Sequence, residues 1–229
     1  MLQVRIKKKL GNFLLDVDFS MEGGIFAILG ASGCGKSMTL KCIAGIERPD
    51  EGRIVLNDRV LFDSAKRMNL PPQKRKVGYM FQDYALFPTM NVVQNIQAGM
   101  GRKPDPKKVR EYITGFQLGG LEHHMPDQLS GGQKQRVAMA RMLAAEPEVL
   151  LLDEPFAAID AKVRQELRTW LRETIDKIGI TSIFVTHDQD EAIEVADEII
   201  ITNEGRVEQM GDPVEIYLHP KTPFVAQFI

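Results

Sequence analysis

The chain has little cysteine, no long apolar run and almost no net charge, and each shortage argues against a class of protein. Its two cysteines, Cys34 and Cys42, are too few for a disulfide framework or a metal site, so we expect free thiols in a reducing cytosol. No apolar run approaches the ~20 residues that span a bilayer, and no apolar segment of a secretory signal follows the basic start. A net charge of −2 over 229 residues provides no overall field for nucleic acid. A role at a membrane would therefore need a partner protein.

The most informative segment is a glycine-rich turn that follows an apolar strand. Residues 25–29 are all apolar, and residues 30–37 fit the phosphate-loop pattern of spaced glycines followed by lysine and serine. Glycines allow backbone N–H groups to turn towards phosphate oxygens, and a helix starting near Lys36 presents its positive end to the same anion. The pattern predicts that Lys36 reaches the β- and γ-phosphates and that Ser37 binds Mg²⁺. A glycine-rich turn without a ligand is the plainer alternative.

The remaining pattern alternates strands with helices. Gly11-Asn12 separates two alternating apolar segments, which predicts a hairpin with a type II′ turn, and Asn57-Asp58 separates a second pair. We expect a polar loop over 63–76, a strand at 77–81 and helices within 88–128. Further strands are expected at 150–152, 182–185 and 199–202, with helices over 163–178, from Asp188 and from Pro213. Asp188 and Glu191 have the spacing of a capping box at the start of their helix. This order favours one α/β domain with small antiparallel additions.

Two carboxylates end one of the expected strands. Asp153 and Glu154 follow the apolar run 149–152. Ligands of open α/β sheets lie beyond the carboxyl ends of the strands, where the phosphate loop also lies. We therefore expect Asp153 to hold Mg²⁺ and Glu154 to accept a proton from an attacking water.

A second helix start is also suited to an anion. Ser130 is a good N-cap, and Gly131 and Gly132 leave backbone N–H groups open at the start of the helix that follows. One nucleotide in one chain has little use for two such sites. The second helix start is therefore expected to serve a nucleotide held by another copy of the chain.

Taken together, these motifs resemble the nucleotide-binding subunit of an ATP-binding cassette (ABC) transporter, in family order over nearly the whole chain. The matched motifs are Walker A (Gly30, Ala31, Ser32, Gly33, Cys34, Gly35, Lys36 and Ser37, followed by Met38 where threonine is common), the Q-loop (Gln82), the signature (Leu129, Ser130, Gly131, Gly132 and Gln133), Walker B (residues 150–154), the D-loop (residues 157–160, with Asp160 kept and the first residue departing from serine) and the H-loop (His187).

The resemblance implies a RecA-like P-loop NTPase core with a parallel sheet, antiparallel β additions and an α-helical signature subdomain. It divides the chain into core residues 1–87, helical residues 88–145 and core residues 146–229. It also implies a homodimer that holds two ATP molecules head to tail, each between Walker A of one copy and the signature and Asp160 of the other. Gln82 would sense Mg²⁺ or the attacking water, and His187 would contact the γ-phosphate.

Several residues have plainer interpretations. Adenine stacks on an aromatic side chain in this family, for which Phe13 is the nearest candidate, while Leu10 is the alternative alignment. Trp170 lies on the apolar stripe of a helix and is expected in the core. His123 and His124 lack further ligands at metal spacing and are expected at the surface. Residues 84–87 could form a groove for a helix of the membrane partner or pack internally.

Residues 71–88 resemble importers that work with an extracytoplasmic solute-binding protein. The short N-terminal hairpin and residues 52–57 are most similar to molybdate and sulfate oxyanion importers, although polyol, sugar, iron and spermidine importers share much of this pattern. The resemblance implies transmembrane permease partners and a peripheral place on the cytoplasmic side of the membrane. The ending at 217–229 resembles the point where such subunits continue into a C-terminal regulatory domain. A soluble ABC ATPase of DNA repair or translation is the alternative, although no coiled coil interrupts residues 38–129. A nucleotide kinase or GTPase would lack the signature, Q-loop and H-loop together.

Overall fold

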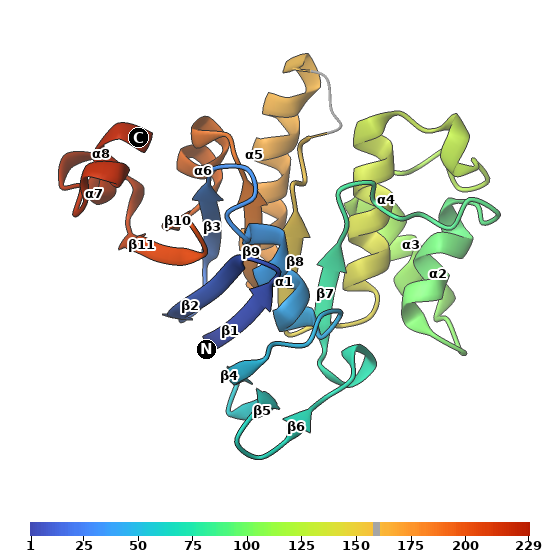
Figure 1. Cartoon of the computed structure of the whole chain (residues 1–229). Coiled ribbons are helices and arrows are strands. Elements are labelled where there is room, and N and C mark those ends of the chain that lie inside the picture. The colour runs from blue at the N-terminus through green and yellow to red at the C-terminus, as the bar shows by residue number, and fades with distance from the viewer. Residues whose placement is uncertain (158–160) are drawn as a thin grey trace.

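The structure is a computed structural model that describes residues 1–157 and 161–229. Among the described residues, eleven strands form one sheet in the order β6-β5-β4-β1-β2-β11-β10-β3-β9-β8-β7 (Figure 1). The strands are β1 (Leu2–Leu10), β2 (Phe13–Met21), β3 (Ile25–Gly30), β4 (Glu51–Leu56), β5 (Arg59–Asp63), β6 (Met68–Asn69), β7 (Val77–Met80), β8 (Val149–Asp153), β9 (Thr181–Thr186), β10 (Glu198–Asn203) and β11 (Arg206–Gly211).

Helices cover both faces of this sheet. They are α1 (Lys36–Ala44), α2 (Val92–Met100), α3 (Pro106–Gly115), α4 (Gly131–Leu143), α5 (Ala161–Ile178), α6 (Gln189–Val195), α7 (Pro213–Leu218) and α8 (Pro223–Phe228), with short 3₁₀ turns η1 (Pro72–Lys74) and η2 (Pro126–Gln128). Figure 1 shows α2, α3 and α4 on the β7 side of the sheet, and α7 and α8 on the opposite side near β11. The expected α/β class is confirmed.

The strands that lead into the motifs are parallel, and the central ones are buried on both faces. β10, β3, β9, β8 and β7 are successive parallel neighbours. Every residue of β3 and β8 is buried, as expected of strands inside a parallel sheet. Ala27 and Leu29 pack with α4, α5 and α6 on one face, whereas Phe26 and Ile28 pack with α1 on the other. The carboxyl ends of these strands therefore meet along one edge of a rigid layer.

The two predicted hairpins are confirmed, and their turns follow from local sequence. Leu10 pairs with Phe13 across Gly11-Asn12, and of the turn pair only Gly11 has a positive φ, at 60°, as a type II′ turn requires. Asn57 and Asp58 have φ values of 46° and 65°, which is the pattern of a type I′ turn.

The expectation of a plain loop over 63–76 is wrong in part. Residues 68–69 form the short strand β6, which pairs with the end of β5, and Pro72 opens the turn η1. The reason is Arg75, which is fully buried and gathers this segment around its guanidinium. Arg75 donates to Asn69 Oδ1 at 2.6 Å and to the Leu70 carbonyl at 2.8 Å.

Arg75 also closes the end of the helix that follows the phosphate loop. It donates to the carbonyls of Cys42 at 2.9 Å and Ile43 at 2.7 Å, two of the last carbonyls of α1. A cation in this place complements the negative end of a helix. Burial lowers the pKa of Arg75 to about 10, which still leaves the guanidinium charged at neutral pH.

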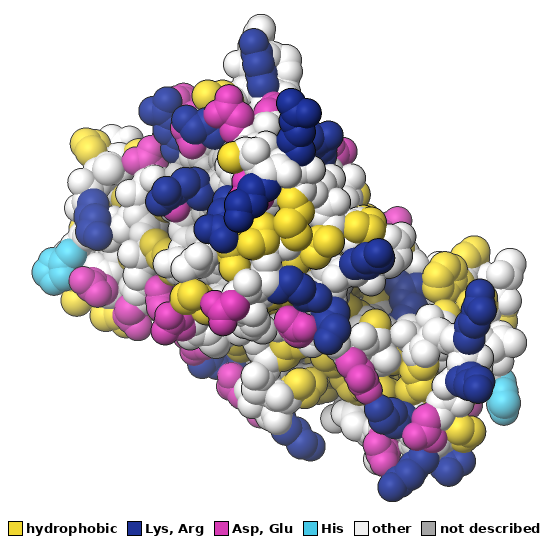
Figure 2. Space-filling model, turned by 90° about the horizontal axis from the view of Figure 1, so that it is seen from below, with side chains coloured by type: hydrophobic (Ala, Val, Ile, Leu, Met, Phe, Trp, Pro, Cys, Tyr) yellow, Lys and Arg dark blue, Asp and Glu magenta, His cyan; other side chains and the backbone are white. Residues whose placement is uncertain are grey.

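Charges on the surface are mixed. On the face seen from below, basic and acidic side chains alternate around apolar patches (Figure 2). Within the described ranges, none of the helices has the length and apolar composition that crossing a membrane requires.

Arg75→Met should lower the free energy of unfolding by about 3 kcal/mol, because four acceptors, two of them in buried bonds, lose this donor while the side-chain volume is kept. Urea unfolding followed by Trp170 fluorescence measures the change. Arg48→Met is the control, since Arg48 is exposed, and it should shift the value by no more than about 0.5 kcal/mol. Equal effects of the two substitutions would contradict this account of Arg75.

Candidate functional site

The phosphate loop joins the end of β3 to the start of α1. Gly33 and Gly35 have φ values of 81° and 96°, a left-handed conformation that costs glycine little. A Cβ atom on Gly35 would also lie 2.7 Å from Leu15 Cδ1, so a larger residue there would have to displace the Leu15 side chain. The first N–H groups of α1, from Lys36, have no acceptor within the helix and face the loop side.

Lys36 lies inside this loop, only 6% exposed. Its Nζ donates to the carbonyls of Gly30 at 2.6 Å and Ala31 at 2.9 Å. No carboxylate of the described chain forms an ion pair with it. A positive charge held by neutral carbonyls in a nearly buried place is well suited to meet a phosphate.

Ser37, Asp153 and Tyr79 form a compact oxygen cluster beside the loop. Ser37 Oγ donates to Asp153 Oδ1 at 2.6 Å, and Tyr79 Oη donates to Asp153 Oδ2 at 2.8 Å. Burial, and then the neighbouring Asp153, raise the pKa of Tyr79, so its hydroxyl stays a donor. Hydroxyl and carboxylate oxygens in contact are the donor set that Mg²⁺ prefers, so the residues present fit this ion. Sequence reasoning missed Tyr79, which lies in the middle of an apolar strand and carries no motif signal.

Glu154, Gln82 and His187 meet at the ends of three adjacent strands. Gln82 Nε2 donates to Glu154 Oε2 at 3.2 Å, and His187 Nδ1 lies 3.5 Å from Glu154 Oε1. Glu154 has a φ of 47°, which is strained for a residue with a side chain, and its N–H donates to the Val185 carbonyl. These three residues are far apart along the chain, and the parallel strand order brings them together.

A hollow of about 440 Å³ lies between the loop and these residues. It is lined by Leu10, Phe13, Ser32, Gly33, Gly35, Lys36, Ser37, Met38, Glu154 and His187. Phe13 and Leu10, the two candidates for contact with adenine, therefore both border this hollow. Trp170 is in the core, as expected, and packs edge-to-face with Phe116 with the two ring centres 5.6 Å apart. His123 is exposed and His124 partly exposed, also as expected.

The signature lies elsewhere. Ser130 caps α4 by accepting from the Gln133 N–H at 3.3 Å, while Gln133 Oε1 accepts from the Ser130 N–H at 2.9 Å. Ser130 is exposed, whereas Gly132 is buried against the helix. None of the residues 129–133 lines the hollow described above. Asp160, the D-loop residue, falls outside the described residues.

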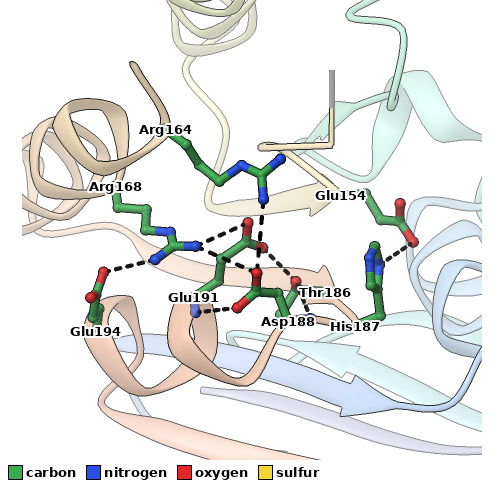
Figure 3. A network of polar contacts seen from close by, with 8 residues as sticks. All are labelled: Glu154, Arg164, Arg168, Thr186, His187, Asp188, Glu191 and Glu194. Carbon is green, nitrogen blue, oxygen red and sulfur yellow. Dashed lines mark hydrogen bonds and ion pairs between the residues drawn. The ribbon is translucent and has the colours of Figure 1, made fainter. Parts of the chain in front are cut away.

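A polar network surrounds the turn that carries His187 (Figure 3). Thr186 Oγ1 donates to a carboxylate oxygen of Glu191 and accepts from the Asp188 N–H at 3.0 Å. The expected capping box at Asp188 and Glu191 is only half formed. Asp188 accepts from the Glu191 N–H at 3.1 Å, but the Glu191 side chain turns to Thr186 and to Arg168 of α5.

The segment after Gln82 combines buried and exposed residues. Tyr84 is buried and donates to the Pro155 carbonyl, whereas Phe87 is 45% exposed. Tyr84 and Ala85 both have positive φ, at 61° and 42°. Arg141 of α4 donates to both of their carbonyls, at 2.9 and 2.7 Å, and its guanidinium lies 5.0 Å from the centre of the Phe87 ring. Through Arg141, α4 thus holds the backbone of this segment in place.

Known proteins match this arrangement. The sequence family described as ABC transporter matches residues 14–157. The sulfate/thiosulfate import ATP-binding protein CysA of Synechococcus elongatus is 51% identical over 98% of this chain and 66% of its own length. The protein of the same name from Acinetobacter baylyi is 50% identical over 100% of this chain and 67% of its own length. The chain therefore spans about two thirds of these relatives.

Solved structures give the same result. The dimeric structure of a post-hydrolysis state of the ATP-binding cassette MJ0796, bound to ADP and Pi, aligns with a TM-score of 0.76 and 28% identity. The alignment covers 93% of this chain and 99% of that chain. A second dimeric structure of the same cassette aligns with a TM-score of 0.77. The resemblance drawn from the motifs is confirmed: this chain belongs to the ABC transporter family.

Proposed function

We propose that this chain hydrolyses ATP as a pair of copies and drives import of an oxyanion through a membrane permease. The observation that carries the proposal is the division of the motifs. Lys36, Ser37, Glu154 and His187 border one hollow, whereas Ser130 caps a helix that does not reach it. A site of this kind gains its missing anion-binding helix from a second copy.

The residues of the hollow have complementary tasks towards bound ATP. Lys36 and the amides of the loop would bind the β- and γ-phosphates. Ser37 and Asp153 would hold Mg²⁺, which supplies positive charge against the phosphate oxygens when bound. Glu154 would accept the proton of the water that attacks the γ-phosphorus, with ADP as the leaving group.

Neighbouring side chains would orient this reaction. Gln82, which donates to Glu154, would hold the carboxylate and the attacking water in line, or sense the Mg²⁺. His187 would contact the γ-phosphate, where negative charge is spread in the transition state. Adenine would stack on Phe13 or lie against Leu10. The partner copy would complete the enclosure with Ser130 and the amides of Gly131 and Gly132, and Asp160 is assigned to the same contact.

The cargo is inferred from the relatives. Proteins about 50% identical to this chain are named for sulfate and thiosulfate import, so we assign a sulfate-type oxyanion. We place the chain on the cytoplasmic side of the membrane, with a permease at the surface around Phe87 and an extracytoplasmic solute-binding protein beyond it. The division into core residues 1–87 and 146–229 and signature residues 88–145 belongs to the same proposal. The alternative in DNA repair or translation has no support from these relatives.

Glu154→Gln should keep ATP binding, lower turnover by a factor of about 10² or more, and trap a dimer in MgATP, because the amide cannot accept the proton. Phosphate release and size-exclusion chromatography measure these effects.

Ser130→Arg should leave ATP binding to the dilute monomer intact and prevent the dimer. A wild-type turnover per molecule that does not depend on protein concentration would refute the paired site.

Expression of this chain in Synechococcus elongatus cells that lack their own CysA should restore uptake of radiolabelled sulfate. The Lys36→Ala variant is the control, since it loses the phosphate-binding charge and should not restore uptake. Uptake that stays at the level of the control, with the chain present at the membrane, would contradict the assignment of sulfate.

A further inference from the structure

We propose that Glu191 and Arg168 are positioning residues for His187, which they hold in place through the backbone of the β9–α6 turn. This inference rests on the proposed function, because His187 is assigned there to the γ-phosphate. It adds two residues from α6 and α5 that none of the sequence motifs contains.

The first step concerns how little holds the His187 ring itself. Its side chain is 65% exposed, and its one polar contact among the described residues is Glu154 Oε1 at 3.5 Å. A ring with so few neighbours takes its position from its backbone. The backbone on either side of His187 is therefore the part that must be fixed.

Thr186 provides that fixation directly. It is 2% exposed, and its Oγ1 accepts from the Asp188 N–H, which closes a turn across His187. The same hydroxyl donates its hydrogen to Glu191 (Figure 3). The Thr186 side chain thus ties the residue before His187 to the peptide N–H after it, and Glu191 determines where that side chain points.

Glu191 is in turn held by Arg168. The Glu191 carboxylate is 7% exposed, and burial raises its pKa, while the Thr186 hydrogen bond and Arg168 oppose that shift. Arg168 Nη2 lies 3.6 Å from Glu191 and 3.5 Å from Asp188, and Nη1 lies 3.1 Å from Glu194. Arg164 of the same helix lies 3.8 Å from Asp188. Removing the buried Glu191 charge leaves Thr186 and Arg168 without their shared acceptor.

The test compares two glutamates of α6 that both contact Arg168. Glu191→Ala should lower kcat for ATP by a factor of about ten to a hundred with KM changed less than about twofold, because a displaced His187 weakens only transition-state contacts. Glu194→Ala, whose glutamate is 41% exposed and does not touch Thr186, should leave kcat within about twofold. In a His187→Ala background, Glu191→Ala should have no further effect.

An equal loss of kcat in the wild-type and His187→Ala backgrounds would overturn the proposal, and so would an unchanged kcat in Glu191→Ala. Glu191→Met, which removes the acceptor for Thr186 but keeps most of the side-chain volume, replaces the alanine variant if that variant does not fold. If the wild-type chain does not hydrolyse ATP, the proposed function fails and NMR decides the positioning separately. The ring resonances of His187 should then shift in Glu191→Ala and stay in place in Glu194→Ala, and an unshifted His187 in both would overturn the inference.

Discussion

The parallel register of β7, β8, β9 and β3 is the constraint on which this site depends. Leu29 of β3 pairs with Thr186, and Asp153 of β8 pairs with Val185, so the strands end at one level. Each strand then continues into a functional segment: Gln82 after β7, Glu154 after β8, His187 after β9 and the phosphate loop after β3. The burial of β3, β8 and β9 on both faces makes the edge rigid, because neither face can shift without opening the core. The geometry of the candidate site is therefore a property of the sheet and not of any single loop.

Charge is distributed around this edge in a way that matches phosphate chemistry. Lys36 is buried among carbonyls, while Asp153 and Glu154 are each held by donors, from Ser37, Tyr79 and Gln82. The carboxylates are thus kept in fixed orientations, and no cation among the described residues forms an ion pair with Asp153. A nucleotide with a divalent cation would supply phosphate charge opposite Lys36 and positive charge opposite Asp153. This fits the family to which the chain belongs.

The sequence was sufficient wherever a feature depends on neighbouring residues. Gly11-Asn12, Asn57-Asp58 and the turn ending at Lys36 are local patterns, and the α/β order follows from the spacing of apolar runs. Contacts between distant residues could be predicted only where a motif marked both ends, as for Ser37 and Asp153. Arg75 meets Cys42 across 33 positions and Tyr79 meets Asp153 across 74, and neither contact leaves a periodic signal. Glu191 illustrates the limit, since its spacing from Asp188 indicated a helix cap but not its contact with Arg168. The functional roles of all the candidate site residues, including Phe13, Asp160 and the signature, stay predictions.

The Arg141 contact has a mechanical consequence. Tyr84 and Ala85 adopt left-handed conformations that side-chain-bearing residues avoid, at a cost of about 1 kcal/mol or more each. One guanidinium holds both carbonyls and also lies against Phe87. Arg141 of α4 thus holds Tyr84 and Ala85 in their strained backbone conformations. A protein that binds Phe87 from outside would therefore act on the same guanidinium, and α4 would receive part of the displacement through Arg141.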